Sequence, residues 1–166
     1  MYPELRWSLS TLSLRYLYVF PPLSRSNGIR ALTLDEGDEL INVMRTDGGQ
    51  NILMATHNGQ AICFAETDVR PMGREAVGVR GIRLRDGDWV VGAEIAQPDA
   101  GVLSITENGY GKRTPAADYI RGGEEPQHRG GSGMKNYNIT DKTGPVAAVK
   151  VVYVKFMPPT KQNGKL

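Results

Sequence analysis

The sequence predicts an all-β protein built from repeated four-stranded units, arranged like the blades of a propeller. Three observations support this prediction: a repeat of fifty residues, short apolar runs separated by glycine-containing turns, and the lack of sustained helical periodicity. With 166 residues, the chain is long enough to bury the core of one ordinary domain.

The repeat is seen when the residues around Gly28 are laid over those around Gly78, 50 positions later. Apolar runs remain in phase with the matched glycines, which stand at positions 28 and 78, 37 and 87, and 59 and 109. A third copy begins at Gly133, 55 residues after Gly78, with the additional residues around 121–126. Periods of this size are typical of units that bury their faces against one another.

Each unit is expected to contain four short strands, separated by turns. The predicted strands are 29–34, 39–44, 52–55 and 60–64 in the first unit, and 79–84, 89–95, 102–105 and 111–113 in the second. The pairs Asn58-Gly59 and Asn108-Gly109 predict two-residue hairpins in which both central residues have positive φ.

The composition narrows the possible functions. The formal net charge of +2 does not by itself indicate a nucleic-acid partner, and no apolar run is long enough to span a membrane. The single cysteine, Cys63, excludes a disulfide within the chain and favours a reducing compartment. Because only His57 and His128 accompany it, we expect neither a metal site nor a cofactor, and the acidic residues are interpreted as turn formers.

Four segments closely resemble the later blades of the C-terminal domain of bacterial DNA gyrase A. They are residues 25–29, 68–74, 78–84 and 106–115. The resemblance implies a β-pinwheel, a relative of the propeller whose neighbouring blades exchange strands, with about two to three of the usual six blades present. It extends over residues 25–152, so that 1–24 is interpreted as a leader and 153–166 as a divergent tail.

The resemblance also implies a function that contains no catalysis. The family binds and wraps double-stranded DNA without sequence preference on a basic rim, and thereby supports ATP-dependent negative supercoiling by the intact type IIA topoisomerase. The active-site tyrosine of that enzyme is expected outside this segment. The implied partners are DNA, the remainder of gyrase A and gyrase B, in the bacterial cytoplasm at the nucleoid and without a membrane.

A short glycine-rich segment resembles the box that marks this family. The segment, called the box segment below, consists of Gln127, His128, Arg129, Gly130, Gly131, Ser132 and Gly133. His128 and Ser132 stand where the family usually has a basic residue. The glycines are compatible with either a backbone nest for a phosphate oxygen or a plain link between two blades.

The candidate DNA-binding residues are cations in predicted loops, in predicted strands, and in or beside the box segment: Arg70, Arg74, Arg80, Lys112, Arg113, Arg129 and Lys135. Such side chains would contact phosphates and carry no sequence information. The alternative is that they are solvated turn residues. Arg80, Arg83 and Arg85 alternate with apolar residues, so they predict either a phosphate track or cross-strand pairing with Asp86, Asp88 or Glu94.

Three other interpretations remain open at this stage. The chain is alternatively a propeller-like protein-interaction scaffold, a truncated gene product without independent function, or the C-terminal domain of the gyrase A counterpart in topoisomerase IV. An incomplete ring would leave open blade edges near 25–34 and 146–152, with Val149 and Val151 exposed, and would favour self-association or poor solubility. The alternative is that residues 1–24 fold back and cap the open edge.

Overall fold

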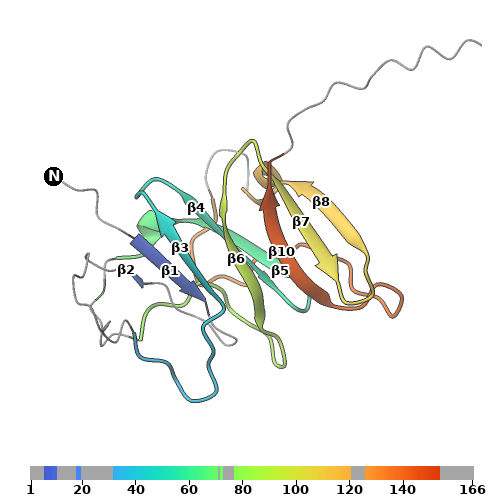
Figure 1. Cartoon of the computed structure of the whole chain (residues 1–166), viewed down its shortest axis with the longest axis horizontal. Helices are drawn as coiled ribbons and strands as arrows, with labels where there is room; N and C mark the ends of the chain where they lie inside the picture. Colours follow the sequence, from blue (N-terminus) through green and yellow to red (C-terminus); the bar gives the residue numbers. More distant parts are fainter. Residues whose placement is uncertain are drawn as a thin grey trace, which may run out of the picture.

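The computed structural model describes residues 6–10, 18–19, 32–70, 72, 77–120 and 126–153, and within this part it consists of three antiparallel sheets. The sheets lie side by side like neighbouring blades (Figure 1). The first has the strand order β2-β1-β3, the second β6-β4-β5-β9 and the third β10-β7-β8. No helix in the described part is both long and apolar enough to cross a membrane.

The elements follow one another with short connections. In chain order they are β1 (Arg6–Ser10), β2 (Tyr18–Val19), β3 (Asn42–Thr46), β4 (Asn51–Thr56), β5 (Gln60–Ala65), the 3-10 turn η1 (Glu66–Asp68), β6 (Val90–Ala96), β7 (Gly101–Thr106), β8 (Gly111–Pro115), the 3-10 turn η2 (Ala116–Tyr119), β9 (Met134–Lys135) and β10 (Val146–Val152). The all-β, propeller-like prediction is therefore confirmed.

Neighbouring repeats exchange strands, as the family resemblance implies. The middle sheet takes β4 and β5 from the first repeat, β6 from the second and β9 from the third. The third sheet is built in the same way, because β10 from the third repeat pairs with β7 of the second. Both inserted strands carry a register shift at the matching point, opposite Thr56 in one sheet and Thr106 in the other.

The prediction that each unit begins with a strand is wrong wherever the structure describes those residues. Residues 32–34 and 79–84 form no strand, and 29–31 lie outside the described residues. In the second repeat the chain crosses the face of the middle sheet at Gly81, where a Cβ would lie only 2.5 Å from the Met54 sulfur. Its backbone groups pair with the box segment instead, through Gly130 N–H to the Gly81 carbonyl and Arg83 N–H to the Gly131 carbonyl.

The hairpin after β4 differs in detail from the prediction. Gly59 and Gly109 have φ of 80° and 81°, but no described residue other than glycine has positive φ, so Asn58 and Asn108 do not. Gly59 N–H donates to the Thr56 carbonyl, and Gln60 N–H donates to the Thr56 hydroxyl. The turn is therefore a type I turn closed by one left-handed glycine, which is the three-residue hairpin, not the two-residue one.

Two apolar cores fill the spaces on either side of the middle sheet. Successive residues of β4 alternate between them because side chains of a strand point to opposite faces. Leu53 and Cys63 pack with Val102 and Tyr119 toward the third sheet. Ile52 and Phe64 pack with Val69, Ile82 and Val90, and Met44 of β3 lies against this second core.

The expectation that Val149 and Val151 are exposed is wrong. Val149 is only 6% exposed and belongs to the core between the second and third sheets, and Val151 packs against the same core. The reason is that β10 pairs with β7 and so presents one face to the middle sheet. β10 is still an edge strand of the third sheet, as predicted, and β8 is the other edge, because no described strand pairs with the outer side of either.

Candidate nucleic-acid interface

The box segment lies along the outer edge of β5. Gln127 N–H donates to the Cys63 carbonyl at one end, and Met134 pairs with Ala61 in β9 just beyond the other end. The approach is close, since a Cβ on Gly133, which has φ of 70°, would lie 2.4 Å from the Ala61 carbonyl oxygen. Gly133 therefore allows close packing of this segment on β5, whereas a Cβ on Gly130 or Gly131 would approach no atom closer than 3.6 Å.

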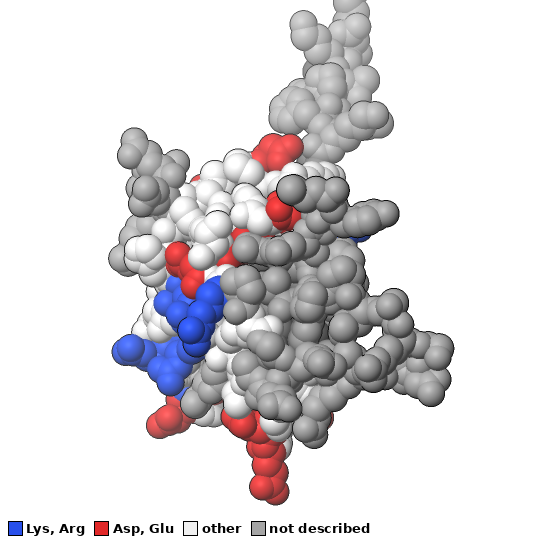
Figure 2. Space-filling model, turned by 90° about the vertical axis from the view of Figure 1, so that its left-hand side faces the viewer, with Lys and Arg blue, Asp and Glu red and all other residues white. Residues whose placement is uncertain are grey.

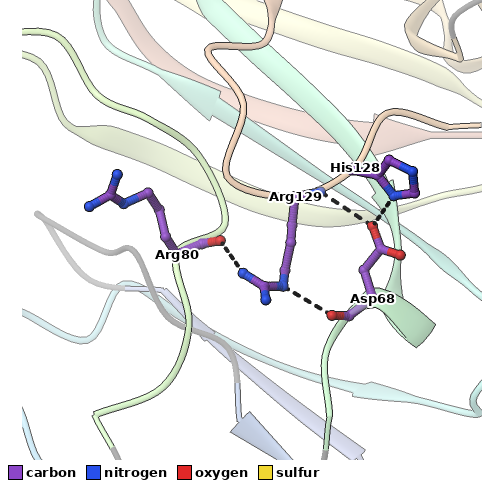
Figure 3. Close-up of polar contacts among 4 residues, drawn as sticks. All are labelled: Asp68, Arg80, His128 and Arg129. Carbon is purple, nitrogen blue, oxygen red and sulfur yellow. Dashed lines mark hydrogen bonds and ion pairs between the residues drawn. The ribbon is translucent and has the colours of Figure 1, made fainter.

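A cluster of four residues holds the box segment to two other segments, and Figure 3 shows how they converge. The Asp68 carboxylate accepts from Arg129 N–H at 3.3 Å and lies 3.2 Å from His128 Nδ1. The Arg129 guanidinium donates from Nε to the Asp68 carbonyl at 3.0 Å and from Nη1 to the Arg80 carbonyl at 3.3 Å. We call Asp68, Arg80, His128 and Arg129 the clasp.

The clasp places several candidate cations near one another. Arg80 and Arg83 are exposed on the segment that the box segment holds, and exposed Arg70 follows Asp68 by two residues. His128 is 95% exposed, whereas Arg129 is partly buried. Arg74 lies outside the described residues.

Pairing of Arg80, Arg83 or Arg85 with Asp88 or Glu94, which is one of the two predictions for these arginines, is not found. Arg80, Arg83 and Arg85 are exposed, while Ile82 is buried and Val79 and Leu84 pack against the core, so the alternation of burial is as expected. Asp88 Oδ1 accepts from the N–H groups of Asn58 and Trp89, and Glu94 pairs with Lys150 at 2.6 Å. These two carboxylates are therefore engaged elsewhere.

A second group of cations continues from the box segment toward the third sheet. Lys135 is in β9, directly after the box segment, and its Nζ donates to Asn138 Oδ1 at 2.6 Å. Lys112 of β8 donates from Nζ to the Asn136 carbonyl at 3.2 Å. The two lysines thus lie on either side of the junction between the second and third sheets.

Asn136 joins these two sheets through a buried polar network. Its side chain is 2% exposed, and its Oδ1 accepts from the Tyr119 hydroxyl at 2.5 Å while its Nδ2 donates to Ser104 Oγ at 3.0 Å. Its backbone N–H donates to the Gly59 carbonyl. This network fixes the backbone that presents Lys135 and accepts from Lys112.

Arg113 lies on the other face of β8 from Lys112, as alternation along a strand requires. It is exposed, and its Cγ and Cδ approach Gly101, so that a Cβ there would lie 3.0 Å from both. The prediction that Lys112 and Arg113 stand on an exposed strand is correct, but the two cations do not share one face.

Lys and Arg side chains gather in one patch on the side of the molecule that carries the first sheet (Figure 2). Acidic side chains border the patch on this face. A patch of cations can provide local positive charge even though the formal net charge of the chain is only +2, and the acidic side chains at its border limit the extent of this positive region.

The Cys63 thiol and the His57 imidazole are both engaged in packing. Burial raises the pKa of the Cys63 thiol from 9.0 to about 11, so the thiol is neutral and a poor nucleophile. His57 stacks on Trp89 with ring centroids 3.8 Å apart. No group of three or more His, Cys, Asp or Glu residues that could bind a metal ion occurs among the described residues.

A match to a family model shows which protein family this chain belongs to. The family model described as the DNA gyrase C-terminal domain, beta-propeller, matches residues 17–47, 50–97 and 102–152. This chain belongs to the DNA gyrase C-terminal domain family. The first matched stretch contains β2 and β3, the second β4 to β6, and the third β7 from its second residue onward and β8 to β10.

Individual members of the gyrase family support the same assignment. The chain is 45% identical over 128 residues to the DNA gyrase A protein of Staphylococcus aureus (strain MRSA252), and 44% identical over 128 residues to that of Staphylococcus epidermidis (strain ATCC 12228 / FDA PCI 1200). Each alignment covers 76% of this chain and 14% of the relative. The aligned part thus corresponds to about one seventh of those gyrase A proteins.

Solved structures show the same fold. The C-terminal domain of DNA topoisomerase IV superposes with a TM-score of 0.78 at 21% identity, covering 90% of this chain and 46% of that one. The DNA gyrase A C-terminal domain superposes with a TM-score of 0.76 at 24% identity, covering 91% and 50%. At these identities the likeness concerns the fold, and the gyrase assignment comes from the sequence matches.

Reasoning from the sequence missed Asp68 and Asn136, although a signal for the first was present. The repeat offset of 50 takes Asp68 to Asp118, and each aspartate lies in the 3-10 turn that follows a hairpin. An acidic residue at the same place in both repeats could therefore have indicated an anchor. Asn136 has no such signal, because the offset of 55 that relates Gly78 to Gly133 takes Gly81 to this position.

Proposed function

We propose that this domain binds double-stranded DNA without sequence preference along its outer edge and bends it there. The single observation that carries the proposal is the row of cations that runs from Arg70 and Arg80, past the box segment, to Lys135 and Lys112. Lys135 and Lys112 lie in β9 and β8, which are edge strands of their sheets, and Arg80 is joined to the box segment beside β9 through the Arg129 hydrogen bond. We take these cations together as one rim.

The chemistry of the rim suits phosphates better than bases. Lys and Arg side chains that neutralise phosphates release counterions, and this provides affinity for any sequence. Reading bases in the major groove needs a helix or ribbon that enters the groove. The helical elements of the described part are two 3-10 turns, of three and four residues, and its candidate cations lie on strand edges and turns.

Within the gyrase A protein, a domain of this kind would support ATP-dependent negative supercoiling by the intact type IIA topoisomerase. The domain itself would not catalyse strand passage, because the family resemblance implies that the active-site tyrosine would belong to another region of that enzyme. Its partners would then be the remainder of gyrase A, gyrase B and DNA. The place of action would be the bacterial cytoplasm, at the nucleoid.

The open outer edge of β8 supports a second, weaker association. An unpaired strand edge invites pairing with another chain, although Lys112 and Arg113 on this strand oppose it. Self-association through this edge therefore remains a prediction of the fold.

Equilibrium binding to linear duplex DNA at several salt concentrations tests the proposal. Two duplexes of equal length and unrelated sequence should bind with the same affinity, and the log–log plot against salt should fall by about 0.9 for each phosphate neutralised. Arg80→Ala should make the slope shallower by about that amount. A slope near zero would show that the rim does not bind phosphates and would favour the protein-interaction scaffold.

A further inference from the structure

The Arg129 side chain is engaged differently from the other cations of the rim. Its guanidinium donates to two backbone carbonyls, of Asp68 at 3.0 Å and of Arg80 at 3.3 Å, and the residue is partly buried. Arg80 itself is exposed. In the close-up, the Arg129 side chain points between the two segments, whereas the Arg80 side chain points away from them (Figure 3).

The Asp68 carboxylate adds a hydrogen bond to the backbone of the box segment, beside those that the Arg129 side chain makes. It accepts from the backbone N–H of Arg129 and lies next to His128 Nδ1, so it fixes the start of the box segment. The box segment then holds 81–83 through two backbone hydrogen bonds, from Gly130 N–H and to the Gly131 carbonyl. Three separate segments, around Asp68, at 80–83 and in the box segment, are thereby held in one arrangement.

We propose that Arg129 is a positioning residue, which together with Asp68 holds the 80–83 segment so that Arg80 and Arg83 can contact phosphates at the same time. Arg129 then contributes to DNA binding without touching DNA itself. The inference rests on the proposed function, since it assigns different roles to two cations of the same rim.

The physical basis is the shape of the guanidinium. Its planar fork presents several N–H donors in fixed directions, so one side chain can join two carbonyls on different segments. A lysine keeps the positive charge but has a single flexible ammonium, and it does not reproduce this bridge. Replacing Arg129 by Lys therefore separates the geometric role from the charge.

The experiment compares Arg129→Lys with Arg80→Lys in duplex binding over a series of salt concentrations. Arg80→Lys preserves a phosphate-binding charge, so affinity and salt slope should stay close to those of the unchanged protein. Arg129→Lys should weaken binding at least about fivefold, equivalent to roughly 1 kcal/mol, and make the slope shallower. Equal behaviour of the two lysine variants would overturn the inference.

A second pair of variants compares the two equivalent aspartates, Asp68 and Asp118. Asp118 is the counterpart of Asp68 in the next repeat, 50 residues later, and it is exposed. Removing an anion near the DNA should by charge alone strengthen binding, and Asp118→Ala should do so slightly or not at all. Asp68→Ala should weaken binding, because the box segment loses its anchor; strengthened binding in this variant would contradict the inference.

Val102→Ala is the control for effects that come only from lost stability. It shortens a buried side chain in the core between the second and third sheets and removes no cation. This variant should lower the melting temperature and leave the salt slope unchanged. If the unchanged protein shows no salt-dependent binding, the proposed function fails; if it binds and only the Arg129 and Asp68 results deviate, the positioning role alone fails.

Discussion

Two glycines at the same place in successive repeats allow the exchange of segments between blades to be tested. Gly59 and Gly109 end equivalent hairpins, with φ of 80° and 81°. A Cβ on Gly59 would lie 2.7 Å from the Tyr137 carbonyl oxygen and 3.2 Å from Ile139 Cγ1. A Cβ on Gly109 would have no other atom within 4 Å.

The expected losses of stability follow from these surroundings. Both alanine variants place a side chain in the left-handed region, which costs about 1–2 kcal/mol. Gly59→Ala must in addition displace the backbone that crosses the hairpin, and overpacking of this kind costs about 1–3 kcal/mol more. In a domain of this size each kcal/mol lowers the melting temperature by about 2–4 °C.

Urea unfolding of the two variants and the unchanged protein measures the difference directly. Gly59→Ala should be the less stable variant by about 1–3 kcal/mol, with an unchanged m-value. Equal losses in the two variants would refute the reasoning, because they would mean that the 137–139 segment does not cross the first hairpin.

Three further predictions concern the rim, the polar network and the buried thiol. Replacing Lys112 and Arg113 together by Ala should weaken duplex binding and make the salt slope shallower by up to about 1.8, while exposed substitutions of this kind change stability by only about 0.5 kcal/mol each; a large fall in melting temperature would show that they are structural. Asn136→Ala should lower the free energy of unfolding in urea by about 1–3 kcal/mol, because Tyr119 and Ser104 lose a buried hydrogen-bond partner. A double-mutant cycle of Asn136→Ala with Tyr119→Phe should show coupling between the two residues. Burial raises the pKa of the Cys63 thiol from 9.0 to about 11, so the folded state keeps the thiol neutral at pH values where the unfolded chain ionises it. The free energy of unfolding should therefore be highest below pH 9 and fall between pH 9 and 11. Cys63→Ala should show a smaller fall over the same pH range.

Much of the architecture was predictable because the repeat carries it. The glycines at 59 and 109 and the apolar runs before and after them mark the hairpins β4–β5 and β7–β8, and these strands are placed correctly. What the repeat does not reveal is which unit a strand joins. The alternating residues of 79–84 look like a strand, but Gly81 lets this segment cross a sheet face, and the alternation of buried and exposed residues survives without strand pairing.

The residue types of the candidate site could be predicted from the sequence, but the hydrogen bonds between its residues could not. The alternation with apolar residues indicated Arg80 as an exposed cation, and the position just after a hairpin turn indicated Lys112; both are exposed. The separate role proposed for Arg129 depends on hydrogen bonds to backbone carbonyls of Asp68 and Arg80, which lie 61 and 49 residues away. Such contacts arise from the exchange of segments between blades, and no local sequence pattern records them.

Bending of duplex DNA along the rim is tested most directly by the linking number of closed-circular DNA. The circles are saturated with the protein, relaxed by a separate topoisomerase and then deproteinised. DNA bent and wrapped on the rim should leave circles with a shifted linking number, and replacing Lys112 and Arg113 by Ala should reduce the shift. An unchanged linking number at saturating protein would contradict the account.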